Sequence, residues 1–312
     1  MSLDRTSLRI ADRKLVLILN HKAGKRQGDA VLRMLQSRLS RAAGGFELIR
    51  VSRGAEIVPA ARRALRQGAD IVAVLGGDGT QSAVAGVLAG TPAIMGVLPG
   101  GTFNYFARGL GVGDTVEQAL ETLLTGQPRR VAVGEVNGRV FLNNVSFGVY
   151  PRILKRRESL YARWGRSRIV AYWSLLSALW DLRRPLRIRL QADERQQLHD
   201  TALAFVGMNA FQLDSLNLDG AEQVRQGHFA IFVARARKRS ELIGPVLRLA
   251  SGTGLRESDF ELITADSVRI ETHPNRRLVA FDGEKARMSG PFHLRVRPEA
   301  LTVIAPAGPD PG

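Results

Sequence analysis

Two glycine-rich loops, each directly after an apolar stretch typical of a buried strand, constrain the fold most strongly. Residues 71–75 read Ile-Val-Ala-Val-Leu and precede Gly-Gly-Asp-Gly-Thr at 76–80, while the apolar residues 93–98 precede Pro-Gly-Gly-Thr at 99–102. A strand that ends in glycines and leads into a helix presents main-chain N–H groups at a helix N-terminus, which attracts phosphate. Two such loops, spaced like neighbouring strands of a parallel sheet, favour a nucleotide-phosphate site over plain turns.

The first half of the chain alternates strand and helix patterns with short loops. We predict strands at 15–19, 46–51, 71–75 and 93–98, and helices at 29–39, 56–67, 81–88, 103–109 and 115–124. This alternation predicts a three-layer α/β domain with a parallel sheet, whose ligands bind at the carboxyl ends of the strands. The loop expected at Asn20 to Gly24 lies on the same rim as the glycine-rich loops.

The pattern changes from about residue 126 to short strands that alternate in polarity. They are predicted at 131–136, 140–144, 186–191, 202–207, 228–234, 267–271, 278–282 and 292–296, with helices at 169–182 and 240–250. We therefore expect an α/β nucleotide-binding domain over residues 1–128, completed by a returning strand within 298–306. A second, mostly antiparallel β domain is expected over 129–297, and a disordered tail over 307–312.

Composition and charge limit the partners. The 312 residues include no cysteine, which excludes disulfides and cysteine-liganded zinc. No apolar run reaches the roughly 18 residues of a membrane span, and the N-terminus lacks a signal-peptide pattern, so we expect a cytoplasmic protein. The net charge of +16 favours a polyanionic partner, either nucleic acid or an anionic lipid surface, with a generally arginine-rich composition as the alternative.

Several polar residues are candidates for phosphate binding or for phosphoryl transfer. Beside bound phosphates, Asp78 would be repelled unless Mg²⁺ mediates or the carboxylate takes a proton. Thr80 is predicted to cap the following helix, and Lys22 can meet phosphate as a point charge. Asp282, before Gly283 and Glu284, reads in isolation as a hairpin turn, but an Asp at a cleft can also act as general base in phosphoryl transfer.

The order and spacing of these motifs resemble the diacylglycerol kinase-like lipid kinases. The resemblance rests on Asn20 with Gly24, on residues 76–80, on Pro99 to Ala107 and on Asp282 to Glu284, and it runs from about residue 15 to residue 304. This superfamily includes sphingosine and ceramide kinases and shares its nucleotide fold with NAD kinases and phosphofructokinases. The resemblance implies a cleft between the nucleotide domain and a C-terminal antiparallel β-sandwich domain, over residues 129–297, that takes the lipid substrate.

The resemblance also implies roles for individual residues. ATP with Mg²⁺ would be held at the glycine-rich loops, Asp282 would be the general base for the lipid hydroxyl, and Glu284 would lie near ATP and the metal. The candidate catalytic residues are Asp282 and Asp78, and Asp78 and Glu284 are the candidate metal ligands. The candidate nucleotide-binding residues are Asn20, Lys22, Gly24, Gly76, Gly77, Gly79, Thr80, Gly100, Gly101, Thr102, Asn104 and Glu284.

Three positions depart from the family pattern. Tyr105 stands where the family usually has Asp, and Ala132 and Gln226 stand where members commonly carry carboxylates. Some bacterial members use the last two positions around a structural metal, so their loss implies that this chain lacks that metal. Asp214 and Asp219 lie nearby in the sequence and leave an alternative ligand set open.

A basic and aromatic segment favours a membrane surface. Arg156, Arg157, Arg163, Arg166 and Arg168 precede the apolar residues 169–180, which include Trp173 and Trp180. Flanking arginines with tryptophans suit an amphipathic helix at a bilayer interface, and each basic residue contributes roughly 1 kcal/mol near an anionic surface. The alternative is a core helix with solvated arginines.

Together these features predict an ATP- and Mg²⁺-dependent lipid kinase, peripherally bound to the inner face of the membrane, that converts diacylglycerol to phosphatidic acid. Sphingosine, ceramide, monoacylglycerol and phosphatidylglycerol are alternative acceptors. A soluble nucleotide kinase and a catalytically silent anionic-membrane sensor are the rival functions. No familiar nucleic-acid module is visible, so no nucleic-acid partner is expected. An exposed strand edge leaves a homodimer open.

Overall fold

The computed structural model describes residues 9–148, 186–192, 195–236, 241, 244 and 257–308. The chain divides into two compact units, here called unit 1 (residues 1–133 and 297–312) and unit 2 (residues 134–296). The boundary predicted at 128/129 falls within strand β5 (Gln127–Val136). The functions assigned to the two domains remain predictions.

Unit 1 is built on a parallel sheet. Its strands are β1 (Lys14–Asn20), β2 (Gly45–Val51), β3 (Ile71–Gly76) and β4 (Ile94–Pro99), in the order β2-β1-β3-β4. The end of β16 (Phe292–Ala305) continues the sheet beside β4, with Thr302 opposite Ile94. The central strand β3 is buried throughout, as expected for a strand with helices on both faces.

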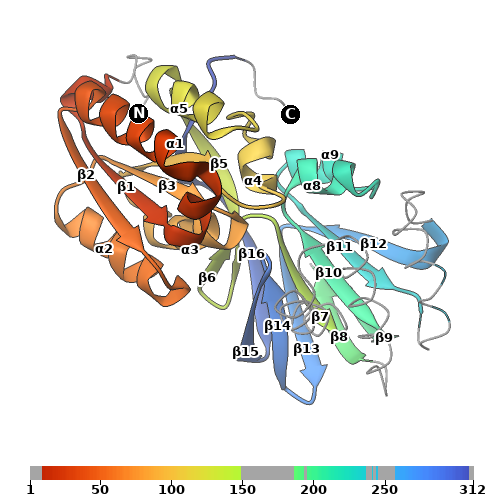
Figure 1. The fold of residues 1–312 in the computed structure, drawn as a ribbon. Helices are drawn as coiled ribbons and strands as arrows, with labels where there is room; N and C mark the ends of the chain where they lie inside the picture. Colours follow the sequence, from red (N-terminus) through yellow and green to blue (C-terminus); the bar gives the residue numbers. More distant parts are fainter. Residues whose placement is uncertain are drawn as a thin grey trace. The chain divides into compact units, whose positions relative to one another are not determined.

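Helices cover both faces of this sheet (Figure 1). Helices α1 (His21–Ala42) and α5 (Val116–Thr125) lie on one face, and α2 (Ile57–Arg66) and α3 (Asp78–Leu88) lie on the other. The short α4 (Tyr105–Gly109) follows β4, and 3-10 turns occupy Ile10–Asp12 and Gly54–Glu56. The layered α/β prediction is therefore confirmed.

The prediction of a loop at Asn20 to Gly24 is wrong, because α1 starts at His21, directly after β1. Gly28, with φ 78° and ψ 161°, interrupts this helix before its second part. Apolar periodicity marks only the amphipathic stretch of a helix. The polar residues 21–27 carry no such signal, so the pattern indicated a helix only from residue 29 onward.

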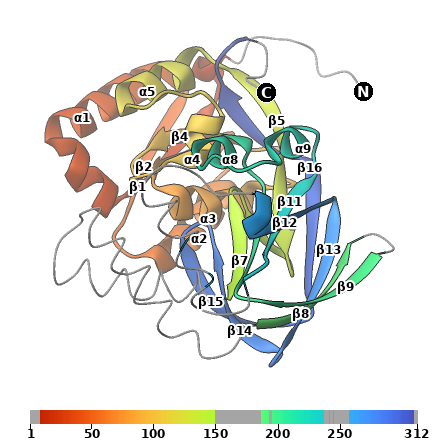
Figure 2. The same cartoon turned by 90° about the vertical axis from the view of Figure 1, so that its right-hand side faces the viewer.

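Unit 2 contains two antiparallel sheets, and Figure 2 shows β7 and β15 in one layer and β13 and β9 in the other. The first sheet runs β12-β11-β10-β7-β14-β15. Its strands are β12 (Phe260–Ala265), β11 (Phe229–Ala234), β10 (Leu203–Gly207), β7 (Asn144–Gly148), β14 (Arg276–Phe281) and β15 (Glu284–Ser289).

The second sheet of unit 2 contains the start of β16 followed by β13 (Ser267–His273), β8 (Leu186–Ala192) and β9 (Arg195–Thr201). Strand β5 forms a hairpin with β6 (Arg139–Phe141), and the short helices are α8 (Ala210–Ser215), α9 (Ala221–Arg225) and a 3-10 turn at Glu257–Asp259. The predicted β-sandwich is confirmed.

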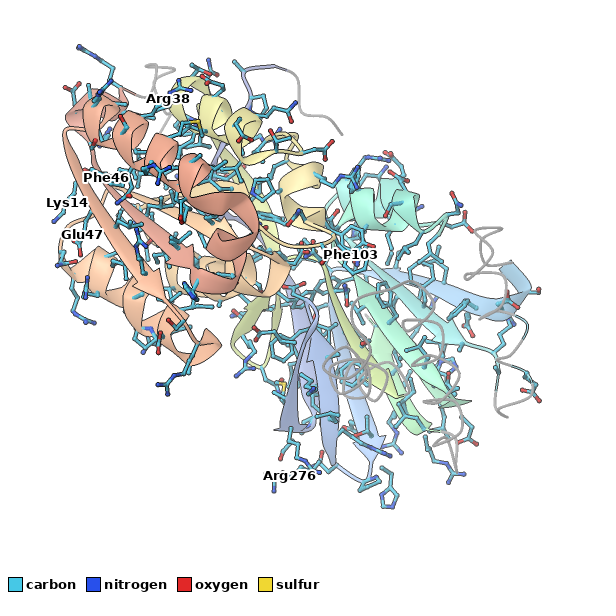
Figure 3. The ribbon with its side chains drawn as sticks, viewed as in Figure 1. Lys14, Arg38, Phe46, Glu47, Phe103 and Arg276 are labelled. Carbon is cyan, nitrogen blue, oxygen red and sulfur yellow. The ribbon has the colours of Figure 1, made fainter. Side chains whose placement is uncertain are left out.

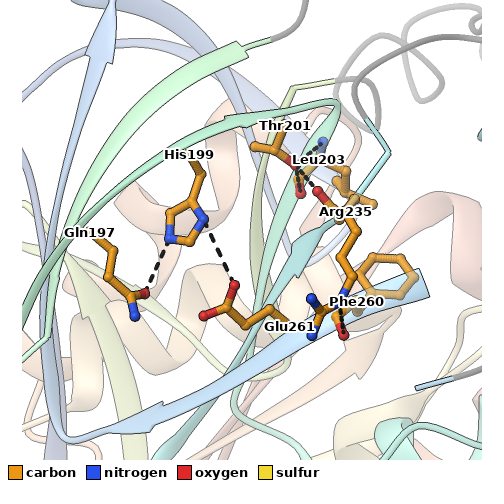
Figure 4. Close-up of polar contacts among 8 residues, drawn as sticks. Gln197, His199, Thr201, Leu203, Arg235, Phe260 and Glu261 are labelled. Carbon is orange, nitrogen blue, oxygen red and sulfur yellow. Dashed lines mark hydrogen bonds and ion pairs between the residues drawn. The ribbon is translucent and has the colours of Figure 1, made fainter. Parts of the chain in front are cut away.

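Aromatic packing and a few polar bonds join the two sheets. The ring of Phe147 on β7 lies 4.9 Å from that of Phe292 on β16. At the other edge, the Thr201 hydroxyl on β9 donates to the Ala234 carbonyl on β11 at 2.6 Å. The nearby His199 ring contacts the Gln197 amide and faces the Glu261 carboxylate on β12 (Figure 4).

Several element predictions differ from the structure. The single strand predicted at 140–144 is two strands, β6 and β7. The strand predicted at 292–296 and the returning strand predicted within 298–306 are one strand, β16. Strands β9, β12 and β15 were not predicted, because they are sheet-edge strands with partly exposed faces. Helices α8 and α9 were not predicted either, because they are too short for helical periodicity. Residues 169–182, 309–312 and most of 240–250 lie outside the described residues.

Candidate active site

The loops after β3 and β4 touch each other in unit 1. The Gly100 N–H donates to the Gly76 carbonyl at 3.0 Å, and the buried Gln81 amide donates to the same carbonyl at 2.9 Å. A Cβ on Gly101 would lie 2.7 Å from the Gly77 Cα, so the close approach of the two main chains requires glycine there. Residues 76–80 and 99–104 are called the rim loops below.

The glycines of the first rim loop lie at the N-terminus of α3. The helix begins at Asp78, and its N-cap is Gly77, which has no side chain to satisfy the first N–H groups. Such N–H groups suit an anion. The prediction that Thr80 caps the helix is wrong, because its buried hydroxyl accepts from the Asn20 side-chain amide at 3.0 Å. The structure thus brings Asn20 to the first rim loop.

Asp78 is held at the start of α4. Its carboxylate Oδ1 accepts the main-chain N–H of Phe106 at 3.2 Å, and the side chain is half-buried. The positive end of the peptide dipoles at a helix N-terminus favours a negative group there. This contact links the first rim loop to the chain that follows the second.

Asn104 closes the second rim loop. It adopts a left-handed conformation with φ 52°, accepts the Gly101 N–H at 2.7 Å and donates to the Gly101 carbonyl. Its neighbour Tyr105 stacks on Phe103 at 5.3 Å between nearly parallel rings (Figure 3 labels Phe103). Tyr105, at the position where the resembled family usually has Asp, is therefore part of an aromatic pair. The nearby Thr102 is exposed.

Asp282 lies in unit 2, in the two-residue hairpin between β14 and β15. Both Asp282 (φ 47°) and Gly283 (φ 80°) have positive φ, and Phe281 pairs with Glu284, as in a type I′ turn. The side chain is only 4% exposed. Its carboxylate accepts main-chain N–H groups of Leu142 (2.7 Å), Asn143 (2.7 Å) and Asn144 (3.1 Å). The residue is thus a hairpin turn and also a fixed, buried carboxylate.

A buried polar cluster surrounds this carboxylate, and most of its residues were not predicted from the sequence. Asn209 donates to Asn143 Oδ1 at 2.7 Å, and Asn144 donates to Gln212 Oε1 at 3.0 Å. Asn143, Asn144, Asn209, Gln212 and Asp282 are called the Asp282 cluster. The one local signal was the consecutive pair Asn143-Asn144 between two strand patterns. Among the described residues, Asn144 Oδ1 and the Ser146 hydroxyl have no hydrogen-bond partner.

Other predicted site residues are placed as follows. Glu284 is exposed and begins β15. Lys22 and Gly24 belong to α1, and the Lys22 side chain lies outside the described part of the structure. Asp214 forms an ion pair with Arg225 at 2.8 Å. The described residues contain no group of three or more His, Asp or Glu that could hold a metal. The predicted membrane contacts, Arg156, Arg157, Arg163, Arg166, Arg168, Trp173 and Trp180, lie outside the described residues.

The rim loops fit the phosphates of a nucleotide with Mg²⁺. A Cβ on Gly77 would lie 3.1 Å from the Gly101 Cα, so glycine is what lets the two main chains approach this closely. The start of α3 has no side-chain cap, which leaves its main-chain N–H groups for an anion. The Asp78 carboxylate supplies the hard oxygen that Mg²⁺ prefers, and Mg²⁺ takes its other ligands from phosphate and water. A single protein carboxylate at the loop is therefore compatible with the ion.

Comparisons with known proteins agree with this architecture. Residues 14–136 match the diacylglycerol kinase catalytic domain, and residues 143–305 match the YegS C-terminal NAD kinase beta sandwich-like domain. A diacylglycerol kinase of Staphylococcus haemolyticus is 24% identical over 275 residues, which are 86% of this chain and 81% of the relative. A diacylglycerol kinase of Staphylococcus saprophyticus is 25% identical over 72% of this chain and 73% of its own.

Solved structures show the same fold. A crystal structure of a diacylglycerol kinase from Bacillus anthracis superposes with a TM-score of 0.70 at 23% identity, and it covers 95% of this chain and 98% of its own. Among the described residues no helix is long and apolar enough to cross a membrane. The two domain matches together with the shared fold show that this chain belongs to the diacylglycerol kinase-like lipid kinases.

Proposed function

We propose that this protein transfers the γ-phosphoryl group of ATP to a lipid hydroxyl and that diacylglycerol, which becomes phosphatidic acid, is the acceptor. The observation that carries the proposal is the buried carboxylate of Asp282. This residue lies in a tight hairpin, and three main-chain N–H groups from residues 142–144 hold its carboxylate in place. Hydrogen bonds of this kind favour the charged carboxylate, which is the form that accepts a proton. The names of the curated relatives support diacylglycerol as acceptor.

The proposal gives each group of residues one task. The main-chain N–H groups of the rim loops hold the phosphates and stabilise the charge of the transferring group, while Asn20 fixes Thr80 beside them. Mg²⁺, when bound at Asp78, would neutralise phosphate charge. Asp282 accepts the proton of the lipid hydroxyl as the new P–O bond forms. Positioning and charge stabilisation supply most of the acceleration.

Two buried side-chain oxygens on strand β7 support a polar acceptor. Asn144 donates its main-chain N–H to Asp282, yet its side-chain oxygen has no partner among the described residues. The hydroxyl of Ser146, two residues along the same strand face, is likewise without a partner there. Buried polar atoms are normally satisfied, so a headgroup hydroxyl or a water molecule is the expected partner.

The test is transfer of labelled γ-phosphate from ATP to a lipid panel in anionic mixed micelles. The panel holds diacylglycerol, monoacylglycerol, sphingosine, ceramide and phosphatidylglycerol, and the variants are Asp282→Asn and, as control, the exposed Asp266→Asn. We expect labelled phosphatidic acid from the wild type and the control, and a loss of at least about 100-fold in Asp282→Asn. If a different lipid carries the label, that lipid and not diacylglycerol is the acceptor. A wild-type rate in Asp282→Asn would show that Asp282 is not the general base.

We also propose peripheral attachment to an anionic membrane through the basic segment that contains Arg156, Arg157, Arg163, Arg166 and Arg168. The support is its composition, with Trp173 and Trp180 in the apolar stretch that follows. Flotation with vesicles rich in phosphatidylglycerol tests it: binding should weaken at high salt and in a variant with all five arginines changed to Gln. Equal flotation of that variant would contradict the proposal.

One observation favours a second function, a catalytically silent membrane sensor on the same scaffold. Tyr105, stacked on Phe103, stands where the family usually has Asp. Vesicle binding without transfer of phosphate to any lipid in the panel would support the sensor and contradict the kinase. Restoring an acid with Tyr105→Asp then tests whether this one position silences the protein.

A further inference from the structure

Three distant chain segments meet around the Asp282 carboxylate within unit 2. They are the junction of β6 and β7 (residues 142–144), the β14–β15 hairpin, and the start of α8. The junction supplies the N–H donors to the carboxylate, and the start of α8 supplies side chains that bind the junction. The hydrogen bonds of each segment explain how the carboxylate is oriented.

Asn143 is fixed through its main chain and its side chain. Its N–H donates to Asp282 Oδ1 at 2.7 Å, its carbonyl accepts the Met208 N–H at 2.8 Å, and its side-chain Oδ1 accepts from Asn209 at 2.7 Å. The residue is 1% exposed, so water does not compete for these bonds. The direction of its N–H is therefore set from the β10–α8 side.

Asn209 performs two tasks at once. Its Oδ1 accepts the Gln212 N–H at 3.0 Å and caps α8, while its Nδ2 donates to Asn143. A main-chain N–H is only a donor, so this bond fixes which end of the Asn209 amide is oxygen. One turn on, Gln212 Oε1 accepts the side-chain amide of Asn144 at 3.0 Å. Consecutive donors to Asp282 are thus each bound by a side chain from the start of α8.

We infer that Asn209 and Gln212 are positioning residues for Asp282. They hold the N–H groups of Asn143 and Asn144, and these N–H groups orient the carboxylate toward the hydroxyl it would deprotonate. The inference rests on the role proposed for Asp282. Small displacements of a catalytic group reduce the rate of the chemical step, so the expected effect is on kcat. The rim loops belong to unit 1, so the KM for ATP should stay the same.

The test variant is Asn209→Ser, which keeps an oxygen to cap α8 but removes the donor to Asn143. Gln212→Met is a second variant of similar length that removes the acceptor for Asn144. The matched control is Thr115→Ala, which removes the side-chain cap of α5 in unit 1 and so lowers stability without changing any bond of the Asp282 cluster. We expect kcat to fall by at least about tenfold in both test variants, with the KM for ATP within twofold of the wild type, and no change of kcat in Thr115→Ala.

A spectroscopic measurement separates this role from a purely structural one. N–H protons that donate to a carboxylate are strongly deshielded, so the amide resonances of Leu142, Asn143 and Asn144 should lie downfield in the wild type. They should move upfield in Asn209→Ser and Gln212→Met, and not in Thr115→Ala. Unchanged resonances, or a kcat as high as that of the control, would overturn the inference.

The same spectra keep the inference separate from the proposed function. If the wild type phosphorylates no lipid, the kinase proposal fails, and the amide resonances alone then decide whether Asn209 and Gln212 set the donors to Asp282. If the wild type is active and Asp282→Asn is not, but both test variants keep full kcat, the proposed function stands and the inference fails.

Discussion

The rim loops of unit 1 and the Asp282 cluster of unit 2 hold their carboxylates in different ways. Each rim loop is a short continuous segment after a strand, and Asp78 is half-buried with the Phe106 N–H as a donor. The Asp282 cluster joins segments up to 140 residues apart and is buried. We therefore expect substitutions in the rim loops to change activity with little effect on stability, whereas substitutions in the Asp282 cluster should change both.

We expect the largest effect from a substitution that disrupts the Asp282 cluster. Asp282→Ala leaves three buried N–H groups without their acceptor, and each such group costs roughly 1 kcal/mol or more. We expect the free energy of unfolding, measured in urea, to fall by about 3 kcal/mol and activity to be lost. Asp78→Ala should also abolish activity but change the free energy of unfolding by less than about 1 kcal/mol.

These two variants test the comparison directly. If Asp282→Ala unfolds at the same urea concentration as the wild type, the cluster does not couple stability to chemistry. If Asp78→Ala is destabilised as strongly as Asp282→Ala, the rim loops depend on their carboxylate to the same degree, and the contrast disappears.

The next effect concerns main-chain contact between the rim loops. In Gly101→Ala the new Cβ would lie 2.7 Å from the Gly77 Cα and 2.8 Å from Asn104 Oδ1. One of these neighbours is main chain and cannot rotate away, so the loops must separate, at a cost of about 1–3 kcal/mol. We expect the KM for ATP to rise at least about tenfold. Gly54→Ala, with open space around its Cβ, is the control and should match the wild type.

The sequence predicted the two sites to very different extents. The rim loops were predictable because strand burial, glycines and the following helix are neighbours along the chain. The α3 start was misjudged: with Gly77 as N-cap, Thr80 lies inside the helix and bonds Asn20 instead. In unit 2 the residues alone predicted a hairpin, and the chemical role of Asp282 came from the family resemblance.

Long-range contacts explain what the sequence could not predict. Nothing near Asn209 or Gln212 in the sequence indicates that they bind residues 143 and 144, which lie 66 and 68 positions away. Strands β9, β12 and β15 were missed because an edge strand lacks the continuous apolar pattern of a central one. The polar strand β9 is recognisable only through its pairing with β8.

A smaller effect is expected at the contact between β1 and the first rim loop. Asn20→Ala removes the bond to the Thr80 hydroxyl, a neutral hydrogen bond whose loss costs about 1 kcal/mol. We expect the KM for ATP to rise about threefold to tenfold and the free energy of unfolding, measured in urea, to fall by no more than about 1 kcal/mol. The exposed Ser40→Ala on α1 is the control. A fall in stability as large as that of Asp282→Ala would show that unit 1 also couples stability to its site.

We expect the smallest effect at Glu56, an exposed carboxylate that accepts main-chain N–H groups from residues close to it in the sequence. Like Asp282, Glu56 accepts main-chain N–H groups, here from Ser52 at 2.8 Å and Arg53 at 3.3 Å. These bonds, that of Ser52 first, lower the pKa of Glu56 below its ordinary value of 4.5. A lowered pKa in the folded state stabilises the fold above the unfolded pKa, and this contribution is lost as the pH falls through the folded value.

Glu56→Gln should therefore lower Tm slightly at pH 7, and the difference from the wild type should shrink as the pH drops below about 4.5. Thermal unfolding between pH 7 and pH 3 measures it, with the exposed Asp219→Asn as control. A difference that stays constant with pH would mean that the charge of the Glu56 carboxylate does not affect stability and that only the packing of its side chain does. Because Glu56 is exposed and its donors lie within four residues, the effect must stay far below that of Asp282→Ala if burial and distance between segments set the coupling.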